Sequence, residues 1–263
     1  MDLSIITADW AYDEDDDANN VRKVVGIDGS MKVQVRIRGG VLQWQLEGRP
    51  DGHRPHGFPS ALDYCSHLLS QRPDPKAEGF VPAAELNPEL TEELAQELFD
   101  YYRRGRALFL LGDYRRALSD ALHNLRTLKL LRESCPDAAA VFGHDRYRPS
   151  LLVDRARAEM LLNVQAGDVR KALDALNRGI RDVEAFYADY ELEERLRDST
   201  ERQILVDLRR SLREKHNVPL NDEELLHSLR AEQEIAIRRE NYEMAARLRD
   251  KINSLRHRIS SQE

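Results

Sequence analysis

The chain has 263 residues, of which 33% are charged and 41% hydrophobic, and its mean hydropathy is -0.63. This composition is typical of a soluble, helix-rich protein, and no apolar run approaches the ~20 residues that a membrane span needs. Seven acidic residues among the first 20 positions account for the net charge of -7, so the rest of the chain is electrically balanced. A dedicated duplex-DNA binder usually has a clearly basic domain. The sequence therefore argues against that class.

The N-terminal residues and the cysteines favour a cytoplasmic location. The opening stretch MDLSIITADW has no basic region before its short apolar run, so it does not resemble a signal peptide. Cys65 and Cys135 lie far apart, lack zinc-type spacing and cannot form a disulfide framework. We expect a reduced, cytoplasmic protein.

The acidic run DEDDD near the N-terminus resembles the beginning of a calcium-binding loop. Asp13, Asp15 and Asp17 match its first ligand positions. However, Ala18 stands where the sharp turn needs glycine, and Val24 stands where the bidentate glutamate belongs. The run therefore indicates a solvated acidic segment.

Residues 32–47 have the pattern of a β-hairpin. Polar and apolar residues alternate on both sides of Gly39-Gly40, and such a pair suits a two-residue loop because glycine readily adopts positive φ. That loop predicts three apolar pairs on one face, namely Ile37 with Leu42, Val35 with Trp44, and Val33 with Leu46. An isolated hairpin is marginal in water, so a strand over Val24–Ile27 or a helix over Ser60–Ser70 is expected to pack against it.

The stretch RPDGHRPHGFP, which follows the hairpin, predicts a compact, turn-rich loop. It contains His53 and His56, but no third ligand stands at a zinc-type spacing. We expect a rigid turn and no metal ligands. The alternative is a metal-dependent activity in this N-terminal His/Asp region.

A Pro-, Ala- and Glu-rich segment over residues 75–90 predicts a linker, after which Thr91 is expected to cap a long helix. Two later stretches, LGDYRRALSDAL at 111–122 and AGDVRKALDALN at 166–177, share one pattern. The first unit resembles a tetratricopeptide (TPR) repeat through Tyr101, Gly105, Leu108, Gly112, Tyr114 and Ala117. The second resembles it through Ala156, Met160, Gly167, Val169 and Ala172. Both predict helical hairpins, since small residues let helices approach closely and Gly-Asp makes the turn. Generic helical hairpins remain the alternative.

The segments around the second unit are less regular. Residues 135–150, CPDAAAVFGHDRYRPS, are expected to form a connecting loop. Residues 184–216 predict one or two amphipathic helices, with a restart at Ser199 or Thr200 and an end before Pro219.

The last 40 residues predict an antiparallel helical hairpin. Asn221 and Glu224 suit a capping box for the first helix, and Asn241 separates it from the second. The second helix has apolar residues at steps of three and four, the pattern of a coiled-coil seam: Ala245, Leu248, Ile252, Leu255 and Ile259. The first helix offers Leu226, Leu229 and Ala236 to this seam, and Gln233 interrupts it.

This hairpin resembles the UVR motif of the UvrB and UvrC excision-repair proteins. The residues at motif spacing, which the resemblance implies as partner-binding residues, are Leu229, Ala236, Tyr242, Glu243, Ala245, Ala246, Leu248, Arg249, Asp250, Ile252 and Leu255. Gln233 departs from the family, which typically has methionine there. The resemblance implies a protein–protein contact, with a UvrB/UvrC-type protein or a Clp-type ATPase as partner. It also leaves open a homodimer, or packing against the chain itself.

Catalytic constellations are absent from the sequence. It holds no GxxxxGK[ST] phosphate loop and no Ser-His-Asp or Cys-His arrangement. Basic residues gather at Arg247, Arg249, Lys251, Arg256 and Arg258, but cations near a helix C-terminus also complement its dipole. We therefore expect no enzyme, no cofactor, no membrane segment and at most weak DNA binding.

These observations predict a mainly α protein of bacterial type. An N-terminal α/β module with a β-hairpin (1–74) precedes a linker (75–90), a TPR-like helical domain (91–220) and a UVR hairpin (221–260). The expected function is that of a non-catalytic adaptor, which docks a partner through the UVR hairpin and the TPR-like helices. The alternative is an accessory factor of nucleotide excision repair with weak DNA binding.

Overall fold

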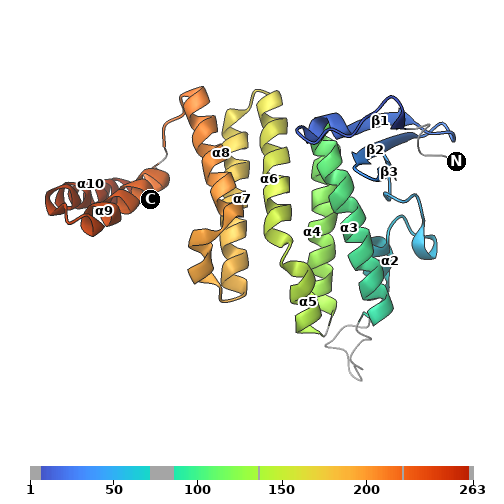
Figure 1. The fold of residues 1–263 in the computed structure, drawn as a ribbon. Helices are drawn as coiled ribbons and strands as arrows, with labels where there is room; N and C mark the ends of the chain where they lie inside the picture. The colour runs from blue at the N-terminus through green and yellow to red at the C-terminus, as the bar shows by residue number, and fades with distance from the viewer. Residues whose placement is uncertain (1–6, 72–85, 136, 221, 261–263) are drawn as a thin grey trace, which may run out of the picture. The chain divides into compact units, whose positions relative to one another are not determined.

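The computed structural model describes residues 7–71, 86–135, 137–220 and 222–260. The described part is mainly helical, with one small antiparallel sheet near the N-terminus, so the predicted fold class is confirmed (Figure 1). Two compact units make up the chain, Met1–Arg210 and Ser211–Glu263. Among the described residues, no helix combines the length and apolar character that crossing a membrane requires.

The sheet contains the predicted hairpin and one further strand. The strands pair in the order β1-β2-β3 and run antiparallel, over Val21–Val25, Met31–Ile37 and Gly40–Gln45. The third strand that the hairpin was expected to need is therefore present. It begins three residues earlier than the predicted Val24–Ile27 segment.

The predicted register of the hairpin is wrong by two residues. Val33 pairs with Trp44 and Val35 with Leu42, so the loop is Arg38-Gly39. Neither Gly39 nor Gly40 adopts a positive φ. The apolar face is retained nevertheless, because side chains alternate with a period of two and a shift of two residues leaves each on the same face.

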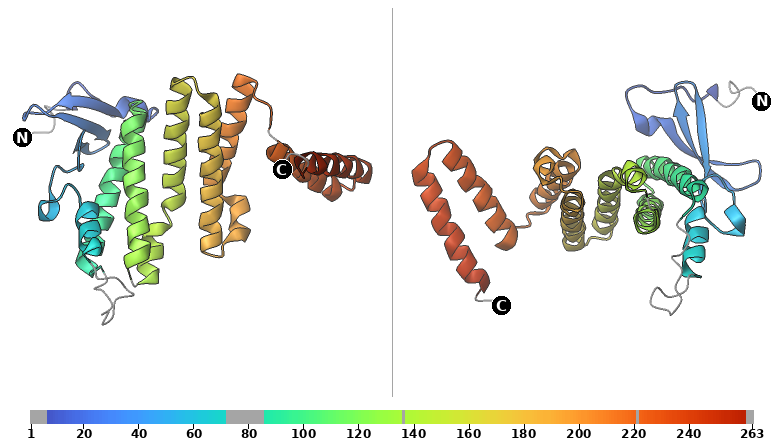
Figure 2. Two further views of the ribbon diagram at one scale, coloured as in Figure 1. Left: turned by 180° about the vertical axis from the view of Figure 1, so that it is seen from behind. Right: turned by 90° about the horizontal axis from the view of Figure 1, so that it is seen from below.

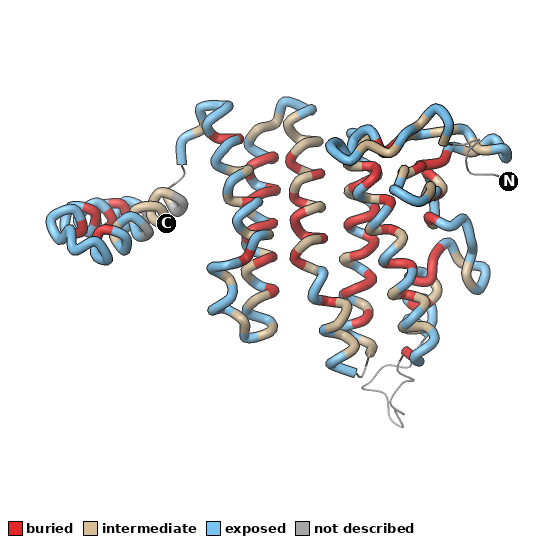
Figure 3. The backbone as a smooth tube through the Cα atoms, in the orientation of Figure 1, coloured by how far each residue is buried: buried red, intermediate tan, exposed pale blue. Residues whose placement is uncertain are grey.

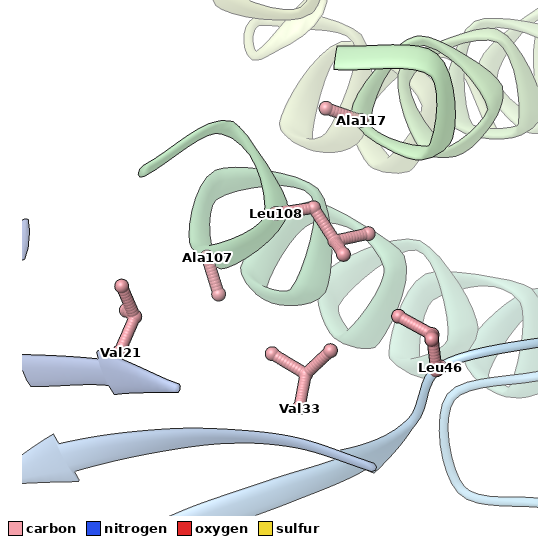
Figure 4. Packing of buried hydrophobic residues seen from close by; sticks show 6 residues of the cluster. All are labelled: Val21, Val33, Leu46, Ala107, Leu108 and Ala117. Atoms are coloured by element: carbon pink, nitrogen blue, oxygen red, sulfur yellow. The ribbon is translucent and has the colours of Figure 1, made fainter. Parts of the chain in front are cut away.

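One face of the sheet packs on the C-terminal half of helix α3 (Pro88–Leu110). Figure 4 shows Val21, Val33 and Leu46 of the sheet side directed toward Ala107 and Leu108 of α3. Ala117 of helix α4 (Tyr114–Ser134) completes this buried cluster. The sheet and the first helical hairpin thus share a hydrophobic core, which explains why so small a sheet is stable.

Helix α2 (Ala61–Ser70) is held against α3 by a buried carboxylate. The helix expected over Ser60–Ser70 is present, and Ser60 caps it: its Oγ accepts a hydrogen bond from Asp63 N. Glu97 of α3, 1% exposed, accepts hydrogen bonds from the first backbone N–H groups of α2, at 2.7 Å from Ala61 and 3.2 Å from Leu62. A carboxylate at a helix N-terminus interacts favourably with the helix dipole. This contact therefore fixes the direction of α2.

Glu97 has two further partners from distant parts of the chain. The Arg49 guanidinium lies 3.0 Å from its Oε2, and His123 Nε2 of α4 lies 2.9 Å from its Oε1. Burial alone would raise the pKa of Glu97, but the hydrogen bonds from His123, Ala61 and Leu62 outweigh it and lower the pKa. The buried carboxyl is therefore held in its ionised form.

The rest of the first unit is built from antiparallel helices that lie side by side (Figures 1 and 2). The two predicted helical hairpins are α3/α4 and α6/α7, with bounds Pro88–Leu110, Tyr114–Ser134, Arg148–Gln165 and Val169–Asp189. Both turns are built alike: Gly112 and Gly167 have φ of 71° and 77°, and the following aspartates cap the next helices. The TPR resemblance itself stays a prediction.

Two local predictions in this region are wrong. Asn87, and not Thr91, caps α3, because its Oδ1 accepts from Leu90 N and Pro88 follows at the first helical position, where no N–H is needed. Residues 135–150 are not a loop: Ala138–Asp145 form α5. The Asp137 carboxylate accepts from two backbone N–H groups of this helix, and its three alanines have the highest helix propensity.

Helix α8 (Thr200–His216) begins where the sequence predicted a restart. The Ser199 hydroxyl accepts from Arg202 N, and a short 3-10 turn over Glu193–Asp198 separates α8 from α7. Gly179 of α7 lies so close to Leu205 that a Cβ added there would stand 3.1 Å from the leucine side chain. Close packing thus fixes the first half of α8 on α7.

Replacement of the buried carboxylate tests its role in stability. We expect Glu97→Gln to lower the free energy of unfolding by about 3 kcal/mol at pH 7, because it leaves Arg49 and the α2 N–H groups without their buried charged partner. The pKa of Glu97 is lowered in the folded state, so its contribution is present above the ordinary value of 4.5 and is lost as pH falls below it. Denaturant unfolding at pH 7 and at stepwise lower pH measures both effects.

The matched control is Glu93→Gln, which removes a carboxylate from the same helix. Glu93 pairs with His56 at 3.3 Å, and both side chains are partly exposed. We expect a change below about 1 kcal/mol. If the free energies of unfolding of wild type and Glu97→Gln differed by the same amount at every pH, Glu97 would not be an ionised carboxylate that stabilises the fold.

Candidate functional site

The candidate site is the helical hairpin of the second unit. Its helices are α9 (Asp222–Arg238) and α10 (Tyr242–Ser260), which run antiparallel (Figure 2). Glu240 in the turn has φ of 55°, and the Asn241 side chain accepts from Met244 N at 3.1 Å. The predicted break at Asn241 is therefore confirmed. The predicted capping-box pair, Asn221 and the Glu224 side chain, lies outside the described residues.

Most of the predicted seam is buried between the two helices. Exposed fractions are 7% for Ala245, 4% for Leu248, 5% for Ile252 and 6% for Leu255. Figure 3 shows the buried positions along the inner side of the hairpin. From α9, Ala236 and Leu229 pack on Ala245 and Leu248, and Leu226 is half-buried. The Ile259 side chain lies outside the described residues.

Gln233 interrupts the apolar seam, but its side chain forms a hydrogen bond across the hairpin. Its Nε2 donates a hydrogen bond of 3.2 Å to the backbone oxygen of Ala245 on the opposite helix. A polar group at a buried or half-buried position requires such a partner. This bond links α9 to α10 at the point where the family typically has methionine.

Charged residues on the hairpin surface are largely paired with one another. The Arg247 guanidinium lies 2.6 Å from the Glu243 carboxylate, as the spacing of four residues predicted, and Arg249 contacts Asp250 at 3.1 Å. Arg258 donates from Nε to Asp222 at 3.2 Å, which joins the end of α10 to the start of α9. Three of the five basic residues singled out in α10 are thus neutralised locally.

The structure divides the predicted site residues into two sets. The seam residues Ala236, Ala245, Leu248, Ile252 and Leu255 are buried, and Leu229 is half-buried, so these side chains hold the hairpin together. The exposed set consists of Tyr242, Glu243, Ala246, Arg249 and Asp250. A partner that meets the folded hairpin can contact only the second set and its neighbours.

A group of exposed apolar side chains lies at the turn end of the hairpin. Ile235 and Ile237 in the last turn of α9 are 50% and 51% exposed, and Tyr242 and Met244 in the first turn of α10 are 68% and 45% exposed. We call these four residues the apolar tip. Sequence reasoning found only Tyr242 among them. The other three could have been found in the sequence, because they are large apolar residues at positions that do not belong to the seam.

The N-terminal His/Asp region has a different arrangement from a metal centre. His56 stacks on Tyr64 with ring centroids 3.9 Å apart, and Asp13 Oδ1 accepts from the backbone N–H groups of Asp15 and Asp16. A hydrogen bond from the Asn19 side chain, followed by these two backbone bonds, lowers the pKa of Asp13. Across the described ranges, no group of three or more His, Cys, Asp or Glu residues is placed to hold a metal ion.

Comparison with known proteins identifies the hairpin. The family model described as the UvrB/uvrC motif matches residues 223–258, which include the turn and most of both helices. This motif is known for protein and DNA interactions in repair-related proteins. No curated protein and no solved structure matches the chain. The chain therefore carries a UVR motif at its C-terminal hairpin, as its sequence predicted.

Proposed function

We propose that the chain is a non-catalytic docking protein, which binds a protein partner through its UVR hairpin. The observation that carries this proposal is the coincidence of the motif with the apolar tip. Four large apolar side chains close to the loop are about half exposed or more, so part of each is in contact with water. Large apolar side chains that are exposed together near one turn can supply the anchors of an interaction site.

The hairpin geometry supports contact through the tip and not through the seam. The seam side chains are already buried against each other, so a partner would have to open the hairpin to reach them. Two helices of this length are below the size that usually folds alone, and added apolar burial would stabilise them. Contact with a partner supplies that burial while it leaves the seam intact.

We further propose a protein of the UvrB/UvrC type or a Clp-type ATPase as partner, because the resemblance of the hairpin implies them. A second copy of the chain is the alternative occupant. We place this function in the cytoplasm, in keeping with Cys65 and Cys135, which are both free thiols. The α3/α4 and α6/α7 hairpins are proposed as a second docking region.

A double substitution at the tip tests the docking proposal. We expect Tyr242→Ser with Met244→Ser to reduce recovery of the partner about tenfold, because two exposed anchors are removed without disturbing the seam. Recovery is measured by quantitative mass spectrometry of proteins captured from native lysate. Circular dichroism should show unchanged helicity, since both side chains are exposed.

Two control variants make the result interpretable. Ile27 is fully exposed in the β1–β2 connection of the first unit, so Ile27→Ser removes an equally exposed apolar group and should leave recovery unchanged. Leu248→Asp places a charge in the seam and should open the hairpin and abolish recovery. If the tip and the Leu248 variants both capture what the wild type captures, the hairpin is not the docking site.

Weak DNA binding, as in an accessory factor of excision repair, is the second candidate function. It is favoured by the basic residues of α10, among which Lys251 makes no ion pair in the described part of the chain. Local pairing of Arg247, Arg249 and Arg258 argues for low affinity.

Fluorescence anisotropy with duplex and single-stranded DNA decides this point. Phosphate contacts predict binding at low salt that falls steeply as salt is added. We expect a small salt slope, because few cations are available. Absence of binding at low salt would eliminate the DNA role. A slope of log K against log salt concentration that corresponds to several phosphate contacts would favour DNA binding over protein docking.

A further inference from the structure

A hollow between α3, α4 and α6 holds a buried amide without a partner. Asn124 of α4 is 0% exposed and lines this hollow, and neither its Nδ2 nor its Oδ1 has a hydrogen-bond partner. Buried side-chain amides are nearly always hydrogen-bonded, because the unpaired group has lost its water without compensation. One open donor and one open acceptor on the same amide match a peptide group, which offers both.

Two arginines line the same hollow without ion-pair partners. Arg106 of α3 donates to the Tyr102 hydroxyl at 3.2 Å, and the Arg157 guanidinium of α6 lies 4.4 Å from the Phe109 ring centroid. Among the described residues, no carboxylate stands within 4.0 Å of either guanidinium. The two cations are therefore held in place and available for an anion.

Among the described residues, Asp154 of α6 is the one carboxyl group that lines the hollow. Burial raises its pKa, although the charges of Arg106 and Arg157 act in the opposite direction. Even with Asp154 ionised, the two arginines leave the hollow with a net positive charge.

An adjoining hollow provides an apolar continuation. Tyr102 and Leu151 line both hollows. The second is mostly apolar, with Phe99 and Tyr147 each 50% exposed, and the carboxylates Glu92 and Asp100 stand on its lining, so the positive charge is confined to the first hollow. The volumes are about 160 Å³ for the polar hollow and about 490 Å³ for the apolar one. The first has room for one residue, and the two together for a few residues of an extended chain. We call the pair the α3/α6 groove.

We propose that the α3/α6 groove binds an extended peptide segment of a partner protein, with an acidic residue at Arg106 and Arg157 and an apolar side chain on Phe99 and Tyr147. The Asn124 amide pairs with the backbone of the acidic residue, donating from Nδ2 to its carbonyl oxygen and accepting its N–H at Oδ1. Charge complementarity selects the acidic residue, and the aromatic side chains select the apolar one. The proposal builds on the docking function, since it assigns a second contact to the first unit.

The test uses a synthetic probe on the full chain, so that it does not depend on the identity of any partner. The probe is the acetylated and amidated tripeptide glutamate–leucine–phenylalanine, and its neutral match has glutamine in place of glutamate. Chemical shifts of ¹⁵N-labelled protein are followed during titration. The expected result is a shift of the Asn124 side-chain amide signals, with affinity about fivefold weaker for the neutral peptide.

Three variants separate recognition from structural damage. Binding to the variants is followed by the backbone amide signals of Gly105 and Ala121, which line the same hollow. Asn124→Leu fills the site without a polar group and should abolish the shifts of these signals, and Arg157→Gln should weaken binding about fivefold. Asp154→Asn removes the repelling carboxylate and should tighten binding about threefold. A residue that merely supports the fold cannot produce a gain in affinity. Circular dichroism confirms that each variant remains folded.

The opposite results are equally definite. If the Asn124 signals do not move, or if Asn124→Leu binds the probe as wild type does, the hollow is a hydrated cavity only and the proposal is wrong. Tighter binding of the neutral peptide would also overturn it. Because the probe does not involve the apolar tip, the Tyr242→Ser/Met244→Ser protein should bind it normally, so failure of the groove and failure of hairpin docking are distinguishable.

Discussion

The buried carboxylate of Glu97 organises the first unit. It accepts hydrogen bonds from the N-terminus of α2, pairs with Arg49 in the segment after the sheet, and contacts His123 on α4. A carboxylate taken out of water is stable only when its partners are all in place. The position of α2, the path of the chain after the sheet and the packing of α4 on α3 are therefore coupled through one side chain. A second buried pair, Arg104 with Asp120, extends this coupling.

Arg104 shows how the sheet is attached to the helices by more than apolar contact. Its guanidinium donates to both oxygens of Asp120 on α4 and to the backbone oxygens of Gln45 and Gly48 at the end of the sheet. These directed bonds orient the sheet on α3, whereas the cluster around Val33 and Leu108 supplies the burial. The apolar contacts favour association, and the polar contacts select one orientation.

The sequence predicted correctly those features that depend on residues close to one another along the chain. The two Gly-Asp turns, the Ser199 and Asn241 helix starts and the seam of the C-terminal hairpin each follow from backbone sterics, capping or periodicity. The match to the UVR motif has the same origin, because its seam and turn are contiguous in sequence. The register of the β-hairpin was mistaken because the loop was placed on the Gly-Gly pair, whereas Gly40 is already part of β3 and the loop is Arg38-Gly39.

The remaining features depend on residues that are distant in sequence. Glu97 and Arg104 look like surface positions of a charged helix, and only the packing of α2, α4 and the sheet reveals that they are buried. Asn124 has no sequence signal at all, since an asparagine on a helix ordinarily faces solvent. The apolar tip was missed for a different reason. Seam periodicity accounts for one stripe of the hairpin and does not draw attention to Ile235, Ile237 and Met244 beside it.

The two proposed contacts differ in physical character, and this difference has a consequence for affinity. The apolar tip gains from burial of hydrocarbon, which salt scarcely weakens, whereas the α3/α6 groove combines charge with directed hydrogen bonds and weakens as salt rises. Each surface is small and should bind weakly by itself. A partner that engaged both would gain from an intramolecular second contact, which raises affinity well above that of either site when the span permits it. Removal of either contact would then cost most of the affinity, and added salt would reproduce the loss of the groove but not the loss of the tip.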